Sequence, residues 1–431
     1  MKIHVVKKGE TIYSIAELYG VPAERIILEN GFAVEGELVP GQNVIITYPQ
    51  KTYIVQNGDT IQKIADSNGI TVLELIRNNP YLLDRQYIYP GETLIISYGN
   101  RIRKITTNGY AREFIDRDVL RKTLPYLTYL SILGYRVIED DKIEEIDDTE
   151  ILQMTKRFGV APLLIITTLS TLGQINVENA YTILNNENKM DILIDNLIDI
   201  LKRKGYYGIN ITYELLTDLT LPAYETFNTK AYKRCKKEGL AFFVTISPHI
   251  VFTANEITFE KIDYSKIVQQ SDRTIVLNYL WGSYMGPPGP IASVLRINEF
   301  LDYLIPQVFP DKLAIGLPLI AYDWELPYSI GLSKAVSLTL EMAIFLAQQF
   351  NAIIQFDEQS QTPFFTYNTA LAGIPINHIV WSVNPTSMDA VLKIITDRGL
   401  NGSGLWNVMT YDPQIWLVIN TQYEIDNIFG A

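Results

Sequence analysis

A short pattern written twice before residue 100 constrains the fold more than any other feature of this chain. Residues 5–20 read VVKKGETIYSIAELYG, and residues 54–69 read IVQNGDTIQKIADSNG. A closing segment, VPGQNVII at 39–46, returns as YPGETLII at 89–96. Repetition at a fixed period indicates a small module used twice. Two linked copies favour a repetitive ligand, because weak linked sites gain avidity.

Each copy predicts the order strand, helix, helix, strand. A β-prone run opens the copy, and Thr11 and Thr60 are expected to cap the first helix. Apolar residues then follow at helical spacing, and Gly20 and Gly69 are expected to end that helix. A second short helix is followed by a Pro-Gly turn and a closing strand.

This pattern resembles the LysM peptidoglycan- and chitin-binding module over residues 2–48 and 51–97. The resemblance implies a shallow groove, beside the first turn and the last loop, that holds N-acetylglucosamine units. The residues that it places at the groove are Gly9, Glu10, Thr11, Gly58, Asp59 and Thr60, with Asn30 and Asn79 nearby. The alternative, of equal weight for any one of them, is that they serve only as caps and turns.

The composition limits which binding partners, disulfides and metal sites are expected. The net charge of −12 disfavours nucleic acid and anionic membranes, whereas a neutral glycan remains allowed. The single cysteine, Cys235, permits no intrachain disulfide and is expected to be an inert filler. Three histidines without an HExxH or His/Cys cluster give no reason to expect a metal site, and no cofactor is expected.

The beginning of the chain, MKIHVVKKGE, runs directly into the first repeat. It has no apolar h-region, so no secretory signal is expected. No stretch of about 20 apolar residues occurs, so no membrane span is expected either. Nothing in the sequence indicates the oligomeric state.

Residues 100–431 have the size and pattern of one (β/α)8 TIM barrel. Buried-strand runs alternate with amphipathic helical runs, which favours a parallel barrel. The expected strands are 104–107, 127–132, 163–168, 208–213, 242–247, 274–279, 313–319 and 402–407. The gap from Ile320 to about His378 is too long for one connection, and we interpret residues 348–378 as a small α+β insertion beside the site.

The fourth expected strand contains a candidate catalytic residue. Side chains alternate along a strand, so Asn210, Thr212 and Glu214 face one way and the apolar residues between them face the other. A buried parallel strand should be apolar on both faces, so the polar face is expected to line the lumen and to end in a carboxylate at the functional rim. Burial raises the pKa of a carboxyl, which is what a general acid near neutral pH requires. The alternative is an ordinary surface glutamate at a solvent-facing strand end.

The segment KGYYGINITYE resembles the active-site strand of family 18 glycoside hydrolases. The resemblance implies that Glu214 protonates the glycosidic oxygen while the N-acetyl oxygen of the substrate attacks the anomeric carbon. The family has Asp two residues before this Glu, to orient the acetamido group, and Thr212 stands there instead. Loss of one preorganised stabiliser typically costs about 10²–10³ in rate.

The sixth expected strand adds a second landmark. Leu277–Gly282 followed by Gly286-Pro287-Pro288 resembles the family segment MTYDWG…GPP. The resemblance gives Tyr279 the role of holding the acetamido oxygen, and Trp281 is expected to contact the substrate. Leu280 stands where the family has Asp, so two carboxylates are missing at one subsite.

Further aromatic matches point to sugar contacts. Tyr322-Asp323-Trp324 resembles the family YDW segment, and Trp406 matches the aromatic residue beneath the reacting sugar. An aromatic ring offers a flat apolar face to sugar C–H groups. The alternative is that these tryptophans belong to the core.

Over its whole length the chain resembles the spore cortex fragment-lytic N-acetylglucosaminidases of endospore-forming bacteria. The resemblance implies hydrolysis of spore peptidoglycan during germination, and synthesis in the mother-cell cytoplasm without a signal peptide before deposition on the spore coat or cortex. Three hypotheses remain open: a working retaining hydrolase, a degenerate barrel that binds glycan, and a structural spore protein anchored by its modules.

Overall fold

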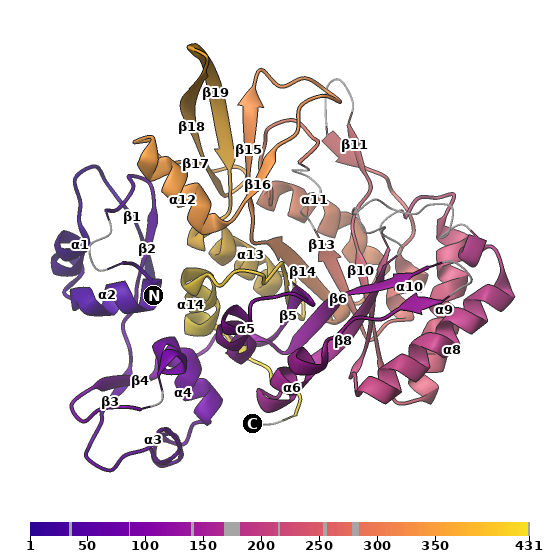
Figure 1. Ribbon diagram of the computed structural model, residues 1–431, viewed down its shortest axis with the longest axis horizontal. Helices are drawn as coiled ribbons and strands as arrows, with labels where there is room; N and C mark the ends of the chain where they lie inside the picture. The colour runs from indigo at the N-terminus through magenta and orange to yellow at the C-terminus, as the bar shows by residue number, and fades with distance from the viewer. Residues whose placement is uncertain are drawn as a thin grey trace.

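In the computed structural model, two small N-terminal modules lie along one side of a β/α barrel (Figure 1). The structure describes residues 1–33, 37–85, 87–138, 142–167, 182–213, 216–252, 257–277 and 284–429.

Both modules have the predicted strand–helix–helix–strand order. Module 1 contains β1 (Lys2–Val5), α1 (Ile12–Tyr19), α2 (Ala23–Asn30) and β2 (Asn43–Ile46). Module 2 contains β3 (Lys51–Ile54), α3 (Ile61–Asn68), α4 (Val72–Asn78), the 3-10 helix η1 (Pro80–Asp84) and β4 (Thr93–Ser97). In each module the two strands pair antiparallel. The Thr11 and Thr60 side chains accept from the backbone N–H three residues later, and Gly20 and Gly69 end the first helices in the left-handed conformation.

Eight parallel strands close the barrel, as predicted. They are β5 (Lys104–Arg112), β6 (Tyr129–Val137), β8 (Ala161–Thr167), β9 (Gly208–Tyr213), β10 (Ala241–Ile246), β13 (Arg273–Leu277), β14 (Leu313–Pro318) and β20 (Gly402–Trp406). Each pairs with the next along the chain, and β20 pairs with β5 to complete the ring. The carboxyl ends of all eight therefore lie at one rim.

Helices cover the outside of the barrel. They are α5 (Arg117–Thr123), α6 (Thr149–Arg157), α8 (Glu187–Lys204), α9 (Leu221–Lys237), α10 (Ser265–Gln269), α11 (Val294–Leu304), α13 (Pro385–Asp397) and α14 (Pro413–Gln422). Short elements complete the connections: η2 (Leu124–Tyr126), β7 (Ile143–Glu144), β11 (Ile250–Phe252), β12 (Ile257–Phe259), η5 (Ile305–Gln307), η6 (Pro310–Lys312) and β21 (Glu424–Ile425). The largest core cluster lies between the strands and these helices, and a smaller one fills the lower lumen around Tyr129, Leu163 and Phe243.

The inserted lobe is larger than the expected 348–378. Its five-stranded sheet has the order β16-β15-β19-β18-β17, and every pairing is antiparallel. The elements are β15 (Ala321–Leu326), β16 (Val336–Leu338), α12 (Leu340–Gln349), β17 (Gln355–Asp357), β18 (Thr362–Leu371) and β19 (Ile374–Trp381). The lobe therefore begins at Ala321, because β15 pairs with β19, which lies more than fifty residues later in the chain. A pairing at that separation leaves no local sequence signal.

The modules are fixed to the barrel by buried polar contacts. Arg77 on α4 donates through Nε to the carbonyl of Pro125, and its own carbonyl accepts from Tyr126 Oη at 3.0 Å and Asn420 Nδ2 at 3.1 Å. Module 1 reaches the lobe, where the N–H of Ile354 donates to the carbonyl of Pro40 at 2.9 Å. Figure 1 shows module 1 beside α12 and α14, and module 2 below it.

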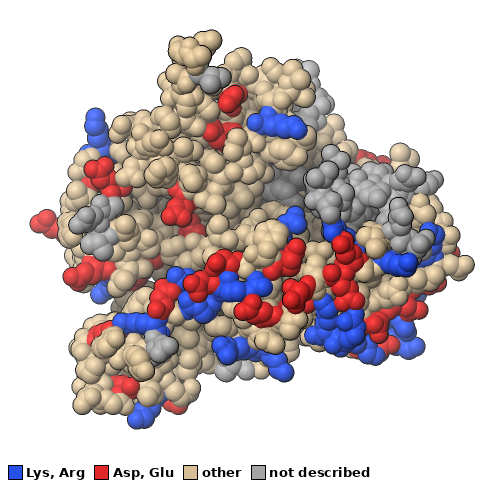
Figure 2. All heavy atoms as spheres, viewed as in Figure 1, with Lys and Arg blue, Asp and Glu red and all other residues tan. Residues whose placement is uncertain are grey.

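Charges on the face shown in Figure 2 are mixed in sign and unevenly spread. They gather in a band across the lower half, while the inserted lobe carries few. The barrel pairs many of its own charges, as in Arg117–Glu150 at 2.8 Å and Arg203–Glu145 at 2.5 Å. Among the described helices, none is long and apolar enough to cross a membrane.

Candidate active site

Asn210 lies at the centre of a polar layer in the barrel lumen and is fully buried. Its Nδ2 donates to Ser131 Oγ at 3.1 Å, and its Oδ1 accepts from Thr245 Oγ1 at 2.8 Å. Tyr110 Oη lies 2.8 Å from Thr245 Oγ1 and 3.5 Å from Asn210 Nδ2. The layer thus joins β5, β6, β9 and β10, and the inward orientation predicted for Asn210 is observed.

The other face of β9 packs outward, as its alternation predicted. Ile209, Ile211 and Tyr213 belong to the core cluster between barrel and helices, and Tyr213 Oη donates to Asn228 Oδ1 on α9 at 3.0 Å. Thr212 is half-buried and stands in register with Thr245 on β10. Because residues in register on parallel neighbours share a face, Thr212 faces the lumen one step nearer the functional rim than Asn210.

Four expected site residues lie outside the described part of the chain: Glu214, Tyr279, Leu280 and Trp281. β9 ends at Tyr213, directly before the first of them, and β13 ends at Leu277, just before the others. Their roles remain predictions.

Trp406 is brought to the polar layer by β20. It is the last residue of that strand, is half-buried and stands in register with Tyr110 on β5. The two rings lie 5.3 Å apart between centroids, at 55°. Gly404, two residues earlier on the same face, leaves no space for a side chain: a Cβ there would lie 2.7 Å from Ile275 Cγ2. The lumen is thus closed beneath Trp406 and Tyr110.

The polar layer is neutral in the described residues. Burial raises the pKa of Tyr110 well above its usual range, although hydrogen bonds from Thr245 and Asn210 oppose the shift. Its phenol therefore keeps its proton at neutral pH. Ser131 Oγ also donates to Asn108 Oδ1 at 2.8 Å, and Asn108 Nδ2 is buried without a partner among the described residues. Over all the residues that the structure describes, no group of three His, Cys, Asp or Glu side chains could hold a metal ion.

The structure places the Tyr322-Asp323-Trp324 segment on β15 of the inserted lobe. Trp324 is fully buried, and its Nε1 donates to the carbonyl of Gly286 at 3.0 Å. The Asp323 carboxylate accepts from Tyr367 Oη at 2.6 Å and lies 3.2 Å from His378 Nδ1. Tyr322 is 7% exposed and packs edge-on against Trp324. These contacts show that the three side chains contribute to the packing of the lobe, and their expected contact with substrate stays a prediction.

The first turns of both modules are open to solvent. Gly9 and Gly58 are exposed with φ of 85° and 84°, and Thr11 and Thr60 are exposed N-caps. Asp59 Oδ2 accepts from the N–H of Gln56 at 2.7 Å and from Tyr53 Oη at 2.8 Å. These residues therefore serve as turns and caps, while their surface remains accessible for the predicted glycan contact.

Asn30 and Asn79 each make structural hydrogen bonds within their module. Asn79 is fully buried; its Nδ2 donates to the carbonyls of Leu75 and Ile95, and its Oδ1 accepts from the N–H of Ile95 at 2.8 Å. Asn30 makes the same three contacts in module 1, with Ile26 and Ile45. Each amide ties the second helix to the closing strand, so burial favours this structural role over the expected sugar contact.

Sequence reasoning missed Tyr110, Ser131 and Thr245, which complete the polar layer. The expected first strand ended at Thr107, whereas β5 continues to Arg112 and brings Tyr110 into the lumen. The alternation argument used for β9 could have found Ser131 and Thr245, which lie within the expected strands 127–132 and 242–247, whereas Tyr110 lies beyond the expected first strand.

Comparison with known proteins assigns the chain to a family. The model of glycosyl hydrolases family 18 matches residues 140–412, and the LysM domain model matches residues 4–47 and 53–97. The chain therefore belongs to glycosyl hydrolases family 18 and carries two LysM domains.

Similar proteins extend over its whole length. The chain is 29% identical to the cortical fragment-lytic enzyme of Bacillus subtilis, with 99% of both chains covered. It is 27% identical to the cortical fragment-lytic enzyme of Bacillus anthracis, again with 99% of both covered. The crystal structure of the Bacillus cereus spore cortex-lytic enzyme SleL superposes with a TM-score of 0.79 at 26% identity, and 99% of each chain is covered.

Proposed function

We propose that this protein binds spore cortex peptidoglycan and hydrolyses its glycan strands after N-acetylglucosamine, with retention of configuration. The observation that carries the proposal is the polar layer of Asn210, Tyr110, Ser131 and Thr245 beneath Trp406 at the carboxyl ends of the barrel strands. Family membership and relatives similar over the whole chain support the same substrate class. Open first turns on both modules provide further glycan contacts.

In the proposed mechanism the substrate supplies the nucleophile. The acetamido oxygen attacks the anomeric carbon, and the bond to the leaving sugar oxygen breaks as Glu214 gives that oxygen its proton. Water then opens the oxazolinium intermediate, and Glu214 takes a proton from that water. Tyr279 holds the acetamido oxygen, and Trp406 supports the apolar face of the sugar. Asn210, held by hydrogen bonds to residues of β5, β6 and β10, sets the shape of the floor below.

The test is hydrolysis of purified cortical fragments by the full chain, with products identified by mass spectrometry and by anomer. We expect reducing-end release by wild type and a loss of at least about 10³-fold in Glu214→Gln. The matched control is Glu299→Gln on α11, at the outside of the barrel, which should leave the rate unchanged. Equal rates for wild type and Glu214→Gln would refute the mechanism.

A second candidate function, glycan binding with negligible turnover, is favoured by Thr212. This uncharged residue faces the lumen at the position where the family pattern has Asp. One carboxylate that would stabilise the positive charge developing on the sugar is therefore missing. This candidate predicts sugar binding without product, and a gain of turnover in the Thr212→Asp/Leu280→Asp double variant. Fast hydrolysis by the native chain would exclude it.

A structural role as a spore anchor makes a separate prediction. We infer that the modules hold the protein on the spore and that synthesis takes place in the mother cell. Deleting residues 1–98 should then abolish spore localisation of a fluorescent fusion and leave cleavage of soluble fragments intact. If cleavage of soluble fragments is lost together with localisation, the barrel depends on the modules for its folding or activity. Buried contacts between the two, such as Arg77 to Pro125, provide a structural basis for that dependence.

A further inference from the structure

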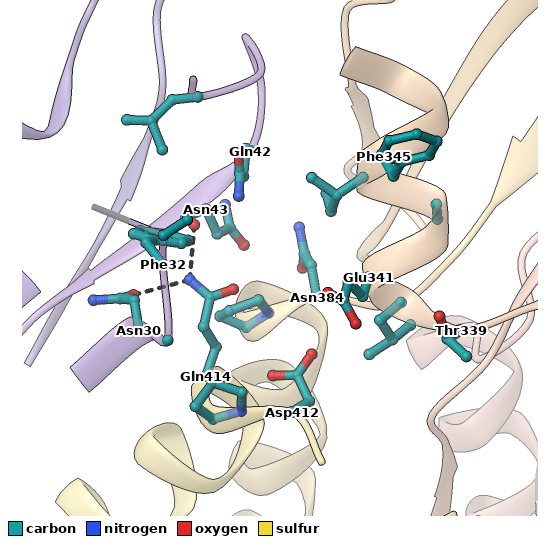
Figure 3. Close-up of a pocket in the computed structure, with 18 of the residues that line it drawn as sticks. Asn30, Phe32, Gln42, Asn43, Thr339, Glu341, Phe345, Asn384, Asp412 and Gln414 are labelled. Carbon is teal, nitrogen blue, oxygen red and sulfur yellow. Dashed lines mark hydrogen bonds between the residues drawn. The ribbon is translucent and has the colours of Figure 1, made fainter. Parts of the chain in front are cut away.

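A cavity of about 760 Å³ lies where module 1, η1 of module 2, α12 of the lobe and the segment before α14 meet (Figure 3). We call it the interface cavity. The lumen residues Asn210 and Trp406 and the first-turn residues Gly9 and Thr11 do not line it, so it lies outside the candidate active site and the open first turns. Asn30 and the last loop of module 1 do line it, so it borders the glycan groove expected on that module. Its size falls within the range of about 300–1,000 Å³ that is usual for small-molecule sites.

The walls carry amide groups whose hydrogen-bonding capacity is only half used. Gln42 Oε1 accepts from the N–H of Val39, and Asn384 Oδ1 caps α13, which leaves both amide nitrogens as donors without partners among the described residues. Gln414 Nε2 donates to Asn30 Oδ1 and to the carbonyl of Asn43, each at 2.9 Å, which leaves its Oε1 as an acceptor. Donors and acceptors therefore both face the space (Figure 3).

Two acidic side chains in the cavity lining disfavour anionic ligands. Glu341 and Asp412 line it without an ion pair among the described residues, and the cation Lys122 is already paired with Asp84 at 3.0 Å. Burial raises the pKa of the Asp412 carboxyl, and the charge of Glu341 adds a smaller contribution in the same direction. Hydrogen bonds from the backbone N–H groups of α14 oppose the shift. The Glu341 carboxylate would repel a phosphate or a carboxylate here, whereas an uncharged ligand would meet no such repulsion.

Two aromatic rings face the space from separate walls. Phe345 projects from α12 and is 55% exposed, and Phe32 comes from module 1 (Figure 3). A ligand that matches this lining must have flat apolar faces and, at its edges, groups that both donate and accept. N-acetylated sugars meet both conditions, because each hydroxyl donates and accepts, the acetamido group has an N–H and a C=O, and the ring C–H groups form apolar faces.

We propose that the interface cavity is an additional glycan subsite, which binds a short stretch of uncharged N-acetylated amino sugars. The proposal rests on the proposed function, because it assumes the same polymer as substrate. Since the walls come from module 1, module 2, the lobe and the barrel, a strand held here would fix the modules and the catalytic domain on one glycan chain. Linked contacts of this kind raise the overall affinity without a new strong contact.

The test is photoaffinity labelling of the full chain with a diazirine-bearing penta-N-acetylchitopentaose, followed by mass spectrometry of the labelled peptides. We expect label on α12 and on residues 410–414 that unlabelled pentamer displaces. The variant Phe345→Ala/Gln348→Ala removes a ring and an amide from exposed positions of α12, so the fold should persist. It should lose at least fivefold of the label at these peptides. Met342→Ala is the matched control, because Met342 is an exposed residue of the same helix outside the lining.

The outcomes separate this proposal from the proposed function. Displaceable label confined to the barrel rim and the first turns of the modules would overturn the interface cavity as a subsite and leave the proposed function standing. Label at α12 that persists in Phe345→Ala/Gln348→Ala, or that falls equally in Met342→Ala, would also overturn it. Absence of displaceable label from the whole chain would count against both proposals.

Discussion

Glu29 stands at the junction of the two modules and makes their packing sensitive to pH. It is 8% exposed on α2; its Oε2 accepts from Thr47 Oγ1 at 2.7 Å and its Oε1 from Tyr98 Oη at 3.2 Å. Burial raises its pKa from 4.5 to about 7, because hydrogen bonds from Thr47 and Tyr98 and the charge of Arg25 only partly offset the cost of burying the anion.

The sign of the effect follows from this raised pKa. The folded module holds the proton over a pH range in which the unfolded chain has lost it. The stabilisation is therefore complete below pH 4.5 and is lost as the pH rises through about 7. At about 1.4 kcal/mol for each pH unit between the two values, the loss amounts to at most about 3 kcal/mol. This is a large share of the stability of a small module.

The variant Glu29→Gln removes the ionisation and keeps the shape. All five tryptophans of the chain lie beyond residue 98, so their fluorescence does not report on the modules, and hydrogen exchange of α2 and β2 peptides is the suitable assay. Comparing variant and wild type at the same pH cancels the intrinsic exchange rates. We expect similar protection at pH 4 and roughly 100-fold more protection of the variant at pH 8, which corresponds to the about 3 kcal/mol above.

The matched control is Glu24→Gln, an exposed position on the same helix, for which the ratio of protection to wild type should not depend on pH. Equal protection of wild type and Glu29→Gln at pH 8 would refute the reasoning. A pH-dependent ratio in Glu24→Gln would show that the effect belongs to the net charge of the helix and not to the buried carboxyl.

Three further predictions test the other structural assignments. Asn79→Ala leaves buried backbone groups without partners and should lower the stability of module 2, measured by hydrogen exchange, by roughly 2–4 kcal/mol. Asn68 is half-buried, and Asn68→Ala should lower it by under about 1 kcal/mol. Equal losses would contradict the role of Asn79 in tying the second helix to the closing strand. Gly41→Ala should detach module 1 from the lobe, because its Cβ would meet the carbonyl oxygen of Ile354, and exchange should rise in β17; Gly91→Ala, at the equivalent left-handed position with open space, should not have this effect. Trp406→Ala should lower kcat/KM on cortical fragments by about 30-fold with an unchanged circular dichroism spectrum, and an unchanged kcat/KM would remove Trp406 from the sugar site.

Local sequence patterns predicted the parts of the fold that local physics determines. The repeat predicted both modules, because a cap, an apolar helical face and a Gly stop act within a few residues of one another. The alternation of β9 predicted that Asn210 and the residues around it face opposite ways, since side-chain direction in a strand depends only on position. The same argument extended to β6 and β10 would have found Ser131 and Thr245, whereas Tyr110 lies beyond the expected end of the first strand.

The inserted lobe marks the limit of that reasoning. The segment with Tyr322, Asp323 and Trp324 is predicted to bind substrate because it resembles the family YDW segment. In the structure it is part of β15, whose partner β19 lies more than fifty residues away. The partners of Asp323, which are Tyr367 and His378, lie 44 and 55 residues further along the chain. No local pattern specifies such a pairing, so the role of this carboxylate could not be read from its neighbours.

The sequence by itself determined two equivalent modules and one barrel with a polar inward strand. Only the tertiary structure made the two modules different. Asn30 shares its Oδ1 with Gln414, and Gly41 packs against Ile354, whereas Gly91 at the matching position faces open space. Capping and alternation are fixed by bonded neighbours, and the repeat therefore encodes them twice. The packing of a module against the rest of the protein depends on the surface that the module contacts. That surface differs between the two modules even where their repeated residues are identical.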